Sequence, residues 1–259
     1  SAPFKTITHA LQQAKPGMTI QLRPGVYGAN SGETFPLQLK SGITLKADPS
    51  ITGQAFQISG GGKYLSKGWA EQNVAIVAAD SSRIEGLSLT NPNAGGIAVW
   101  VETGSPTIAN NRFVGSDREG ILVTGNASPT IQDNGFEQNG GNGLSFTNNA
   151  SGVLQGNLIR NNGFGVIIGD RAAPQLINNE ISGNKDGLVI NGEAKPKLQF
   201  NLIEANGRDG VVVTNNAQPT FQQSTFNDNG QFDLNNTSRE PLQVKGTDLA
   251  NLKVTGEVQ

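Results

Sequence analysis

Charged and aromatic side chains of the kinds that bind sugars and other polar ligands gather at a few places in this sequence. Carboxylates, ammonium groups and guanidinium groups hydrogen-bond to hydroxyl and ionic groups, and an aromatic ring packs on the apolar face of a sugar. Most of these charged residues flank short runs of β-branched residues. We therefore expect a ligand-binding set among Trp100, Arg118, Asp170, Arg171, Lys185, Asp186, Arg208, Asp209, Tyr64 and Trp69.

Several other kinds of site are disfavoured by what the chain contains. Its single histidine, His9, lies in a predicted N-terminal helix, and the chain has no cysteine. This argues against a Ser-His-Asp triad, a thiolate nucleophile and a histidine metal site. No spacing matches a glycine-rich nucleotide motif or a calcium-binding repeat. We expect neither a resident metal nor a cofactor.

The overall composition argues against nucleic acid and the membrane interior as partners. A net charge of −2 and the lack of a Lys/Arg cluster argue against a nucleic-acid partner. No apolar run is long enough to cross a membrane, and no signal peptide is visible. Neutral Asn, Gln, Thr and Gly dominate the expected surface, which favours a secreted or cell-envelope protein.

The elements that must position these side chains belong to a repeat of 22 to 24 residues. A short period with β-branched residues, interrupted by Asn and Gly, is typical of a β-solenoid. We predict an all-β, right-handed parallel β-helix with three sheets and about ten coils. The three interior columns are Ile108, Ile131, Leu154, Leu176, Leu198, Phe221; Phe113, Phe136, Ile159, Ile181, Ile203, Phe226; and Ile121, Leu144, Val166, Leu188, Val211, Leu234.

Two asparagine columns mark the predicted corners. Asparagine tolerates a left-handed backbone, and its amide can bond to the equivalent amide one coil away, so no buried polar group is left unpaired. A glycine column precedes the third strand, and aligning Gly96 with Gly120 places Trp100 in the column of Thr124. The asparagine columns are Asn111, Asn134, Asn157, Asn179, Asn201 and Asn139, Asn162, Asn184, Asn206, Asn229.

We expect one β-helix domain over residues 1–259, with two ends and one insertion that depart from the repeat. Residues 1–18 form a cap, in which Thr6 begins a short amphipathic helix. Residues 19–240 form the coils, and an excess of about eight residues falls within 60–71. Tyr64 and Trp69 in this insertion either contact a ligand or pin the loop to the coil. Residues 241–259 form an irregular last turn or lid.

The chain resembles the pectin-lyase-like superfamily of right-handed parallel β-helices. Its repeat is similar to that of carbohydrate-binding proteins and sugar hydrolases, and its opening most resembles an uncharacterised bacterial branch. The superfamily contains enzymes and non-enzymes, so the resemblance implies the fold and leaves the activity open. The opening residues that carry it are Pro3-Phe4-Lys5-Thr6-Ile7, Ala10-Leu11, Pro16-Gly17-Met18-Thr19-Ile20 and Pro24-Gly25-Val26-Tyr27.

The resemblance also implies where catalysis would take place, namely on the outer face of the third strand. The hydrolases would need paired carboxylates there, and the lyases a basic residue, usually with calcium nearby. None of the residues that we expect to point outward is ionisable, which favours a protein without this chemistry. Calcium would be required only if the chain were a lyase. The expected outward residues are Ala98, Leu122, Ser145, Ile167, Val189 and Val212, followed by Trp100, Thr124, Thr147, Gly169, Asn191 and Thr214.

Leu122, Ile167, Val189 and Val212 form an outward apolar stripe along successive coils. Each such side chain is worth roughly 1.5–3 kcal/mol when fully buried, so we predict that the stripe is covered. The cover is either the chain itself, through the insertion or the segment after Pro241, or a second copy in a two-fold homodimer. An open stripe would favour a ligand groove instead.

Three classes of function follow. The favoured one is a non-catalytic, extracellular or cell-envelope protein that binds polysaccharide. The second is a polysaccharide lyase or C5-epimerase acting on uronate polymers through loop residues. The third is a structural, self-associating solenoid. An ice-binding face ranks last, because its threonine column is interrupted at Gly169 and Asn191.

Overall fold

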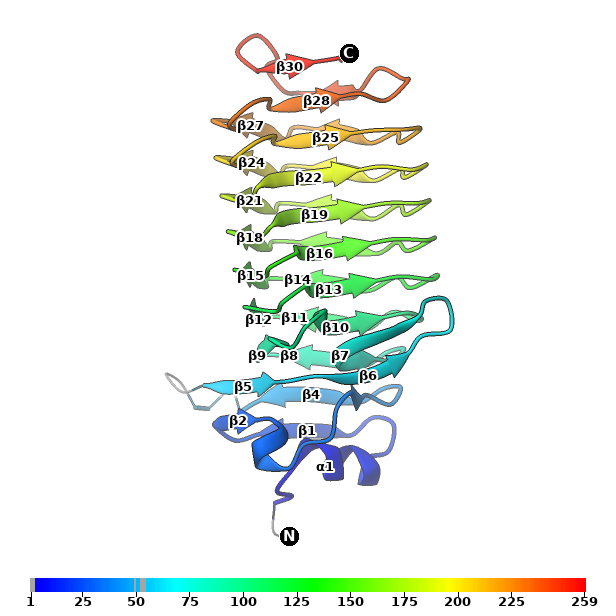
Figure 1. The fold of residues 1–259 in the computed structure, drawn as a ribbon, viewed down its shortest axis with the longest axis vertical. Helices are drawn as coiled ribbons and strands as arrows, with labels where there is room; N and C mark the ends of the chain where they lie inside the picture. The colour runs from blue at the N-terminus through cyan, green and yellow to red at the C-terminus, as the bar shows by residue number, and fades with distance from the viewer. Residues whose placement is uncertain (1–2, 49, 52–54) are drawn as a thin grey trace.

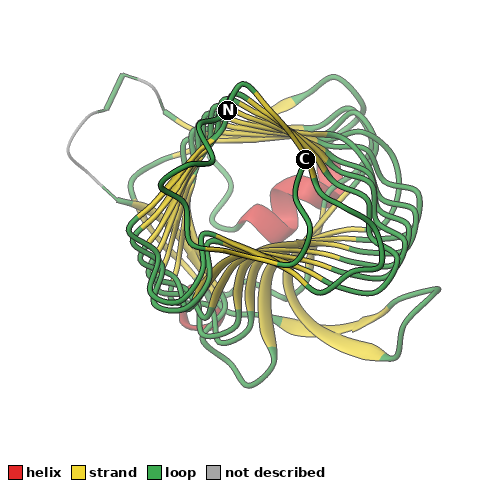
Figure 2. Cartoon of the chain, turned by 90° about the horizontal axis from the view of Figure 1, so that it is seen from above, coloured by secondary structure: helices red, strands yellow, loops and turns green. Residues whose placement is uncertain are grey.

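The chain winds into a β-solenoid of about ten turns, in which strands of successive turns pair in parallel (Figure 1). The structure is a computed structural model and describes residues 3–48, 50–51 and 55–259. The three sheets form the sides of a tube, and helix α1 (Ile7–Gln13) lies across one end of it (Figure 2). The predicted all-β, three-sheet fold with an N-terminal capping helix is confirmed.

Each turn contributes one strand to each sheet, in the order A, B, C for the regular turns. Sheet A contains β1 (Thr19–Leu22), β4 (Thr44–Ala47), β8 (Arg83–Glu85), β11 (Thr107–Ala109), β14 (Thr130–Gln132), β17 (Val153–Gln155), β20 (Gln175–Ile177), β23 (Lys197–Gln199), β26 (Thr220–Gln222) and β29 (Gln243–Lys245). Sheet B contains β2 (Gly25–Tyr27), β5 (Phe56–Ser59), β9 (Ser88–Thr90), β12 (Arg112–Val114), β15 (Gly135–Glu137), β18 (Leu158–Arg160), β21 (Glu180–Ser182), β24 (Leu202–Glu204) and β27 (Thr225–Asn227).

Sheet C is the longest of the three. It contains β3 (Leu37–Gln38), β7 (Glu71–Ala78), β10 (Gly96–Val101), β13 (Glu119–Val123), β16 (Asn142–Phe146), β19 (Phe164–Ile168), β22 (Asp186–Ile190), β25 (Val211–Val213), β28 (Leu234–Asn236) and β30 (Val254–Thr255). The remaining elements are β6 (Gly62–Leu65), which pairs with β7, and a short 3-10 helix η1 (Ala29–Ser31).

The interior of the tube is a column of apolar side chains, as the repeat predicts. The members of the three predicted columns are all buried, and equivalent residues pair across successive turns. Phe113 and Phe136 stack face to face, with ring centroids 4.7 Å apart. Side chains alternate across each strand, so three residues per strand are enough to present one or two apolar groups to this column.

The asparagine columns form two buried ladders of hydrogen bonds. Asn157 Oδ1, for example, accepts from both the backbone N–H and Nδ2 of Asn134, and Asn157 Nδ2 donates to Asn179 Oδ1. The predicted ladder is confirmed, but the left-handed backbone was assigned to the wrong residue. Positive φ occurs one position earlier, at 57° for Asn110 and 56° for Asp133.

The alignment of Gly96 with Gly120 is wrong by two residues. Glu119 pairs with Ile97, and Leu122 pairs with Trp100, so Ala98 belongs to the interior column. Glycine is required at these two positions for different reasons. A side chain at Gly120 would collide with Phe113 and Phe136 inside the tube, whereas one at Gly96 would collide with the backbone of its own preceding turn.

The two ends of the solenoid are closed differently. Thr6 caps α1 by accepting a hydrogen bond from the backbone N–H of His9, and the Glu33 carboxylate accepts from the N–H groups of Ile7 and Thr8. At the other end β29 and β30 extend sheets A and C by one more turn, and Leu242 is buried there.

The insertion forms an antiparallel hairpin of β6 and β7. It crosses the front of sheet C near the N-terminal end of the solenoid (Figure 1). Leu65 and Glu71 form the last pair before the turn. Of the outward positions of sheet C, the hairpin therefore covers those of the early turns and leaves those of the later turns open.

Candidate functional site

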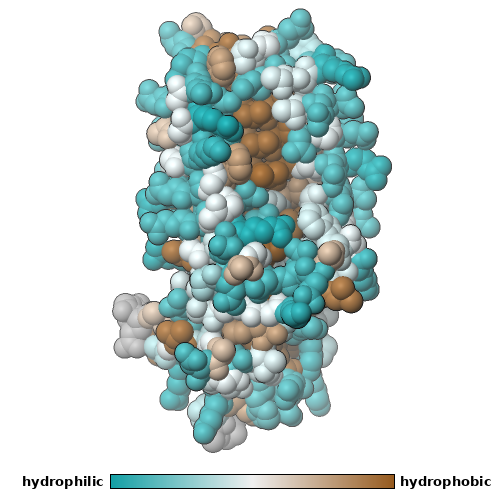
Figure 3. Space-filling model, viewed as in Figure 1, coloured by the Kyte–Doolittle hydropathy of each residue, from teal (hydrophilic) through white to brown (hydrophobic). Residues whose placement is uncertain are grey.

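The open part of sheet C carries a hollow with an apolar floor between two polar rims. Figure 3 shows it as a brown strip in the upper half of the molecule, flanked by hydrophilic residues. Its floor consists of Phe164, Ile167, Val189 and Val212, all of them partly exposed. We call these four residues and the hollow above them the sheet C trough.

The cover predicted for this stripe exists over only part of it. Leu122 is buried in a cluster with Trp100, beneath Tyr64 and Trp69 of the hairpin. The segment after Pro241 continues the end of the solenoid instead, so the prediction that it covers the stripe is wrong. Coverage by a second copy stays a prediction. Within the described residues Ile167, Val189 and Val212 remain open, which favours a ligand groove.

A column of residues that is polar except for Phe164 runs along one side of the trough, at the first position of the strands. Glu119, Asn142, Phe164 and Asp186 occupy equivalent positions on β13, β16, β19 and β22. The expectation that no ionisable residue lies on this face is therefore wrong. The strands begin one residue before the glycine column, so the residue that precedes each glycine lies on the outer face and not in the corner.

Asp186 and Asp209 are buried carboxylates held by specific donors. Asp186 is 0% exposed and forms an ion pair with Arg208, whose Nε lies 3.0 Å from Asp186 Oδ1. The backbone N–H of Asp209 donates to the same oxygen. Asp209 in turn accepts from the N–H of Phe232 and from Asn235 Nδ2. All four carboxylate oxygens are thus engaged, and the Arg208 side chain, 45% exposed, presents the positive charge to solvent.

Glu119 is the carboxylate with the least complete set of partners. Its Oε1 accepts from Asn142 Nδ2 at 3.1 Å and from Ser145 Oγ at 3.0 Å. Its Oε2 has no hydrogen-bond donor among the described residues, although Arg118 Nε lies 3.3 Å away as an ion-pair partner. Burial raises the pKa of Glu119, and Arg118, Ser145 and Asn142 only partly oppose this. Arg118 also donates to Gln72 of the hairpin.

The trough ends at the hairpin. Trp100 points out of the solenoid, as expected, but it is 0% exposed because Tyr64 and Trp69 pack on it. It cannot offer its indole to a sugar in this conformation, so the expected stacking role is wrong for this state. Tyr64 and Trp69 pin the hairpin to the sheet, which was the other interpretation of these two residues.

Glu102 fixes the tip of the hairpin. Its carboxylate accepts from Tyr64 Oη at 2.8 Å, Ser66 Oγ at 2.6 Å and the backbone N–H groups of Lys67 and Gly68. Burial raises the pKa of Glu102, but these hydrogen bonds together outweigh it and hold the pKa below its usual value. Burial and the adjacent Glu102 raise the pKa of Tyr64 to about 12.

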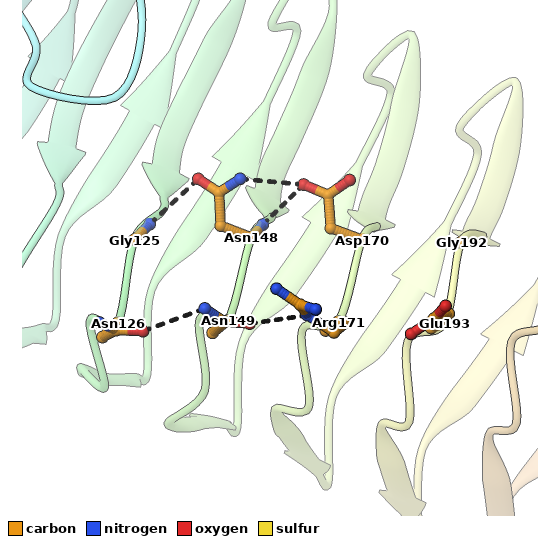
Figure 4. Close-up of a pocket in the computed structure, with 8 residues that line it drawn as sticks. All are labelled: Gly125, Asn126, Asn148, Asn149, Asp170, Arg171, Gly192 and Glu193. Carbon is orange, nitrogen blue, oxygen red and sulfur yellow. Dashed lines mark hydrogen bonds between the residues drawn. The ribbon is translucent and has the colours of Figure 1, made fainter.

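The opposite rim of the trough contains Asp170 and Arg171. Figure 4 shows them on two rows of hydrogen-bonded side chains that line an open pocket of about 650 Å³. Asp170 Oδ2 accepts from Thr147 Oγ1 and from the backbone and side-chain nitrogens of Asn148, and these bonds, the Thr147 bond above all, lower its pKa. Arg171 Nε donates to Asn149 Oδ1.

The expected ligand-binding residues therefore fall into three groups around sheet C. One side of the trough is lined by Arg118, Lys185, Asp186, Arg208 and Asp209. The other rim contains Asp170 and Arg171. The contact between the hairpin and the sheet is formed by Tyr64, Trp69 and Trp100. The structure thus brings the expected ligand-binding residues together around sheet C, but Trp100 is not exposed for a sugar to stack on.

The sequence analysis missed the aromatic residue on the open floor, which is Phe164. Lys185 Nζ lies 5.6 Å from the centroid of its ring, within the range of a cation–π contact. The signal was present, because Phe164 directly precedes Gly165 and Glu119 directly precedes Gly120. That position is the outward one in every turn of this region.

The described residues offer neither a metal-binding cluster nor a membrane-spanning helix. They contain no group of three or more His, Cys, Asp or Glu side chains placed to hold a metal ion. None of the helices found in the described ranges has the length and apolar character needed to span a bilayer.

Comparison with known proteins identifies the family. The chain matches the family described as "Protein of unknown function (DUF1565)" over residues 1–252, and it belongs to that family. A search of the curated proteins finds no match.

Solved structures share the fold at low sequence identity. The chain is similar to pectate lyase Pel9A, with a TM-score of 0.60 and 16% identity over 93% of this chain and 72% of that one. It is also similar to the A-module of the mannuronan C-5 epimerase AlgE6 of Azotobacter vinelandii, with a TM-score of 0.61 and 16% identity over 89% and 73%. The periplasmic alginate epimerase AlgG gives a TM-score of 0.50 and 14% identity over 90% and 69%. These likenesses confirm the resemblance to right-handed parallel β-helices of the pectin-lyase-like kind.

Proposed function

We propose that this DUF1565 protein binds a polysaccharide chain in the sheet C trough and does not catalyse a reaction on it. The observation that carries the proposal is the partly exposed Phe164 ring, with Lys185 Nζ 5.6 Å from its centroid, on a floor of Ile167, Val189 and Val212 between two polar rims. A sugar ring has an apolar face and a polar edge, so a surface with an apolar floor and polar walls fits it well.

The dimensions of the trough favour a chain over a single sugar. Ile167, Val189 and Val212 form one row on three successive turns, with Phe164 on the first of them, and Asn235 continues the row on a fourth. Strands lie about 4.8 Å apart, so the apolar floor extends about 10 Å along the solenoid axis, and the row that ends at Asn235 extends about 14 Å. A polymer that lies along this axis would contact the same kinds of residue on each turn.

The state of the carboxylates supports binding without catalysis. A general acid or base must reach the reacting proton with a free oxygen. The oxygens of Asp186 and Asp209 are all occupied by Arg208, Asn235 or backbone N–H groups. On Asp170 only Oδ2 is engaged, by Thr147 and Asn148, and these bonds lower its pKa, which makes it a weaker base. These groups hold the loops and rims in place and leave their cationic partners facing the solvent.

We further propose that the protein works outside the cytoplasm, in the cell envelope or as a secreted protein. The support consists of the surface rich in neutral Asn, Gln, Thr and Gly and of the likeness in fold to a periplasmic alginate epimerase.

One observation favours a second candidate, a lyase or C5-epimerase acting on a uronate polymer. Glu119 has an unpaired oxygen, a raised pKa and the guanidinium of Arg118 beside it, at the end of the trough. A carboxylate with a raised pKa can take a proton, and a guanidinium can neutralise the adjacent carboxylate of a uronate. Against this candidate, the Glu119 side chain is only 5% exposed.

Affinity electrophoresis tests the proposal. The protein is run in native gels that contain soluble neutral or acidic polysaccharides, and we expect at least one polymer to retard it. Phe164→Ala should weaken the affinity for that polymer, while Phe4→Ala, which removes an exposed ring 56% open to solvent at the other end of the chain, should leave it unchanged.

The same polymers separate binding from catalysis. Pectate and alginate are incubated with the protein while unsaturated products are followed by absorbance and C5 proton exchange by NMR. Product or exchange that Glu119→Gln abolishes would replace the binding proposal by the second candidate. Absence of retardation in every polymer would reject the binding proposal.

A further inference from the structure

Phe200 lies at the corner between sheets A and B and is unusual in two ways. Its φ is 57°, and it is 50% exposed. The left-handed region is unfavourable for a bulky residue, because its Cβ crowds the following carbonyl oxygen. Equivalent corners of four other turns use Asn110, Asp133, Gly156 and Asn178, which are types that tolerate a positive φ, whereas the next turn has Gln223.

Among the described residues, no packing contact of the Phe200 ring offsets the cost of this backbone conformation. It belongs to neither buried apolar cluster, and it makes no aromatic contact with the described residues. A backbone outlier that packing does not explain is a reason to look for a function, since such conformations concentrate at binding sites. Phe200 directly follows Gln199, the last residue of β23 in sheet A, and half of its surface is exposed to solvent.

The surface next to Phe200 is polar and cationic. A shallow hollow of about 370 Å³ on β23, β26 and β29 is lined by Lys197, Gln199, Gln222 and Lys245. Gln199 Nε2 donates to Gln222 Oε1 at 3.0 Å, which aligns the two amides across neighbouring turns. Within the part of the chain that the structure describes, neither lysine belongs to an ion pair.

We propose that Phe200 and this hollow form a second binding site, for a saccharide unit that carries a carboxylate or sulfate group. The ring supplies a stacking surface, and the aligned amides supply a donor and an acceptor for neighbouring hydroxyl groups. The two unpaired ammonium groups select an anionic ligand. The hollow has no deep apolar pocket of the kind that anchors a protein partner. This site lies on sheet A, on a different side of the tube from the sheet C trough (Figure 2), and does not depend on the function proposed for that trough.

The first test concerns the strained backbone. Phe200→Asn places at this corner the residue type that Asn110 and Asn178 provide, and we expect the melting temperature to rise by about 2–4 °C. Gln223→Asn is the matched control, because Gln223 has a φ of 47° in the same column one turn later. Both substitutions should stabilise the fold, but only the first removes the ring.

The second test measures binding in the Phe164→Ala background, so that the sheet C trough does not contribute. Native gels contain carboxymethyl cellulose, polygalacturonate or chondroitin sulfate, with hydroxyethyl cellulose as the neutral polymer. We expect retardation by at least one acidic polymer, a loss of affinity of at least about five-fold in Phe200→Asn, and retained affinity in Phe200→Tyr and Gln223→Asn.

Three results would overturn the proposal. If the Phe200→Asn substitution leaves the retardation unchanged in all four polymers, the Phe200 ring does not contribute to binding. A loss of thermal stability in Phe200→Asn would show that the ring is a packing residue. Retardation that depends on Phe200 only in hydroxyethyl cellulose would exclude the anionic ligand.

Discussion

The indole of Trp69 lies edge-on against the indole of Trp100, with ring centroids 5.9 Å apart and ring planes at 86°. This contact joins the tip of the β6–β7 hairpin to the outer face of β10. Because of this contact, Trp100 holds the hairpin on sheet C and is not available to stack on a sugar. The hairpin also marks one end of the sheet C trough. The open aromatic platform of that trough is Phe164.

Removal of the hairpin contact should expose Trp100. The chain contains two tryptophans, so Trp69→Phe leaves Trp100 as the only indole and keeps an aromatic ring at position 69. We expect its fluorescence to resist quenching by acrylamide, because Trp100 is 0% exposed. Trp69→Ala should increase the quenching several-fold while the far-UV circular dichroism stays unchanged. Equal quenching in the two variants would contradict the described packing.

The hydrogen bonds that hold the hairpin tip to Glu102 should weaken in acid. Its pKa is lowered in the folded state, so its contribution to stability is present above the pKa of an unfolded carboxyl, about 4.3, and is lost as pH falls through the folded value. In the Trp69→Phe background, quenching of Trp100 should therefore rise below about pH 4. Tyr64 has the opposite sign: its pKa of about 12 preserves the bond to Glu102 until the solution becomes strongly alkaline.

Glu102→Gln is the control for this pH dependence. The amide can accept some of the same hydrogen bonds but has no proton to gain in this range. We expect its acrylamide quenching at pH 7 to exceed that of the parent and to change little between pH 7 and pH 4. An acid transition that persists unchanged in this variant would assign the opening to another group.

Loss of a ladder asparagine should be costly. Asn157→Ala removes the acceptor of the buried Asn134 N–H and the donor to the buried carbonyl of Ile131, while Asn134 Nδ2 keeps the carbonyls of Ile108 and Gln132. Each orphaned group costs about 1–3 kcal/mol, so we expect a loss of at least about 2 kcal/mol in the free energy of unfolding by urea. Asn149→Ala, which removes an exposed amide from the outer rows of Figure 4, should cost less than about 1 kcal/mol. Similar losses in both variants would refute the ladder's role.

Glu119→Gln should stabilise the protein at neutral pH. A raised folded-state pKa means that the contribution of this group is fully present below the unfolded pKa and is lost as pH rises through the folded value. The variant avoids that loss and keeps an acceptor for Asn142 and Ser145. The difference in melting temperature between the variant and the parent should therefore grow from pH 4 to pH 7. A difference that shrinks over this range would show that Arg118 fully compensates the buried charge.

The repeat made the architecture predictable, because each apolar column must fall inside the tube and each corner asparagine must find its partner one turn away. Register was harder to predict. Gly96 and Gly120 look equivalent in the sequence, but one relieves a local turn and the other makes room for Phe113 and Phe136. This shift of two residues misplaced Trp100 and Ala98.

The candidate site was less predictable than the fold. The cover over Trp100 depends on how an eight-residue excess folds back as a hairpin, which the repeat does not specify. The contacts of Glu102 with Tyr64 and Ser66 join residues more than 30 positions apart. Phe164 and Glu119 were predictable in principle, because the residue before each glycine of this column is the first of its strand.

Binding of a polysaccharide in the sheet C trough is best tested by a crystal structure with a bound oligosaccharide. Crystals would be soaked with fragments of whichever polymer retards the protein, at concentrations well above the measured Kd. We predict sugar density along the solenoid axis over Phe164, Ile167, Val189 and Val212, with one ring stacked on Phe164. An empty trough under these conditions, with the Phe164 ring in contact only with solvent, would contradict the claim.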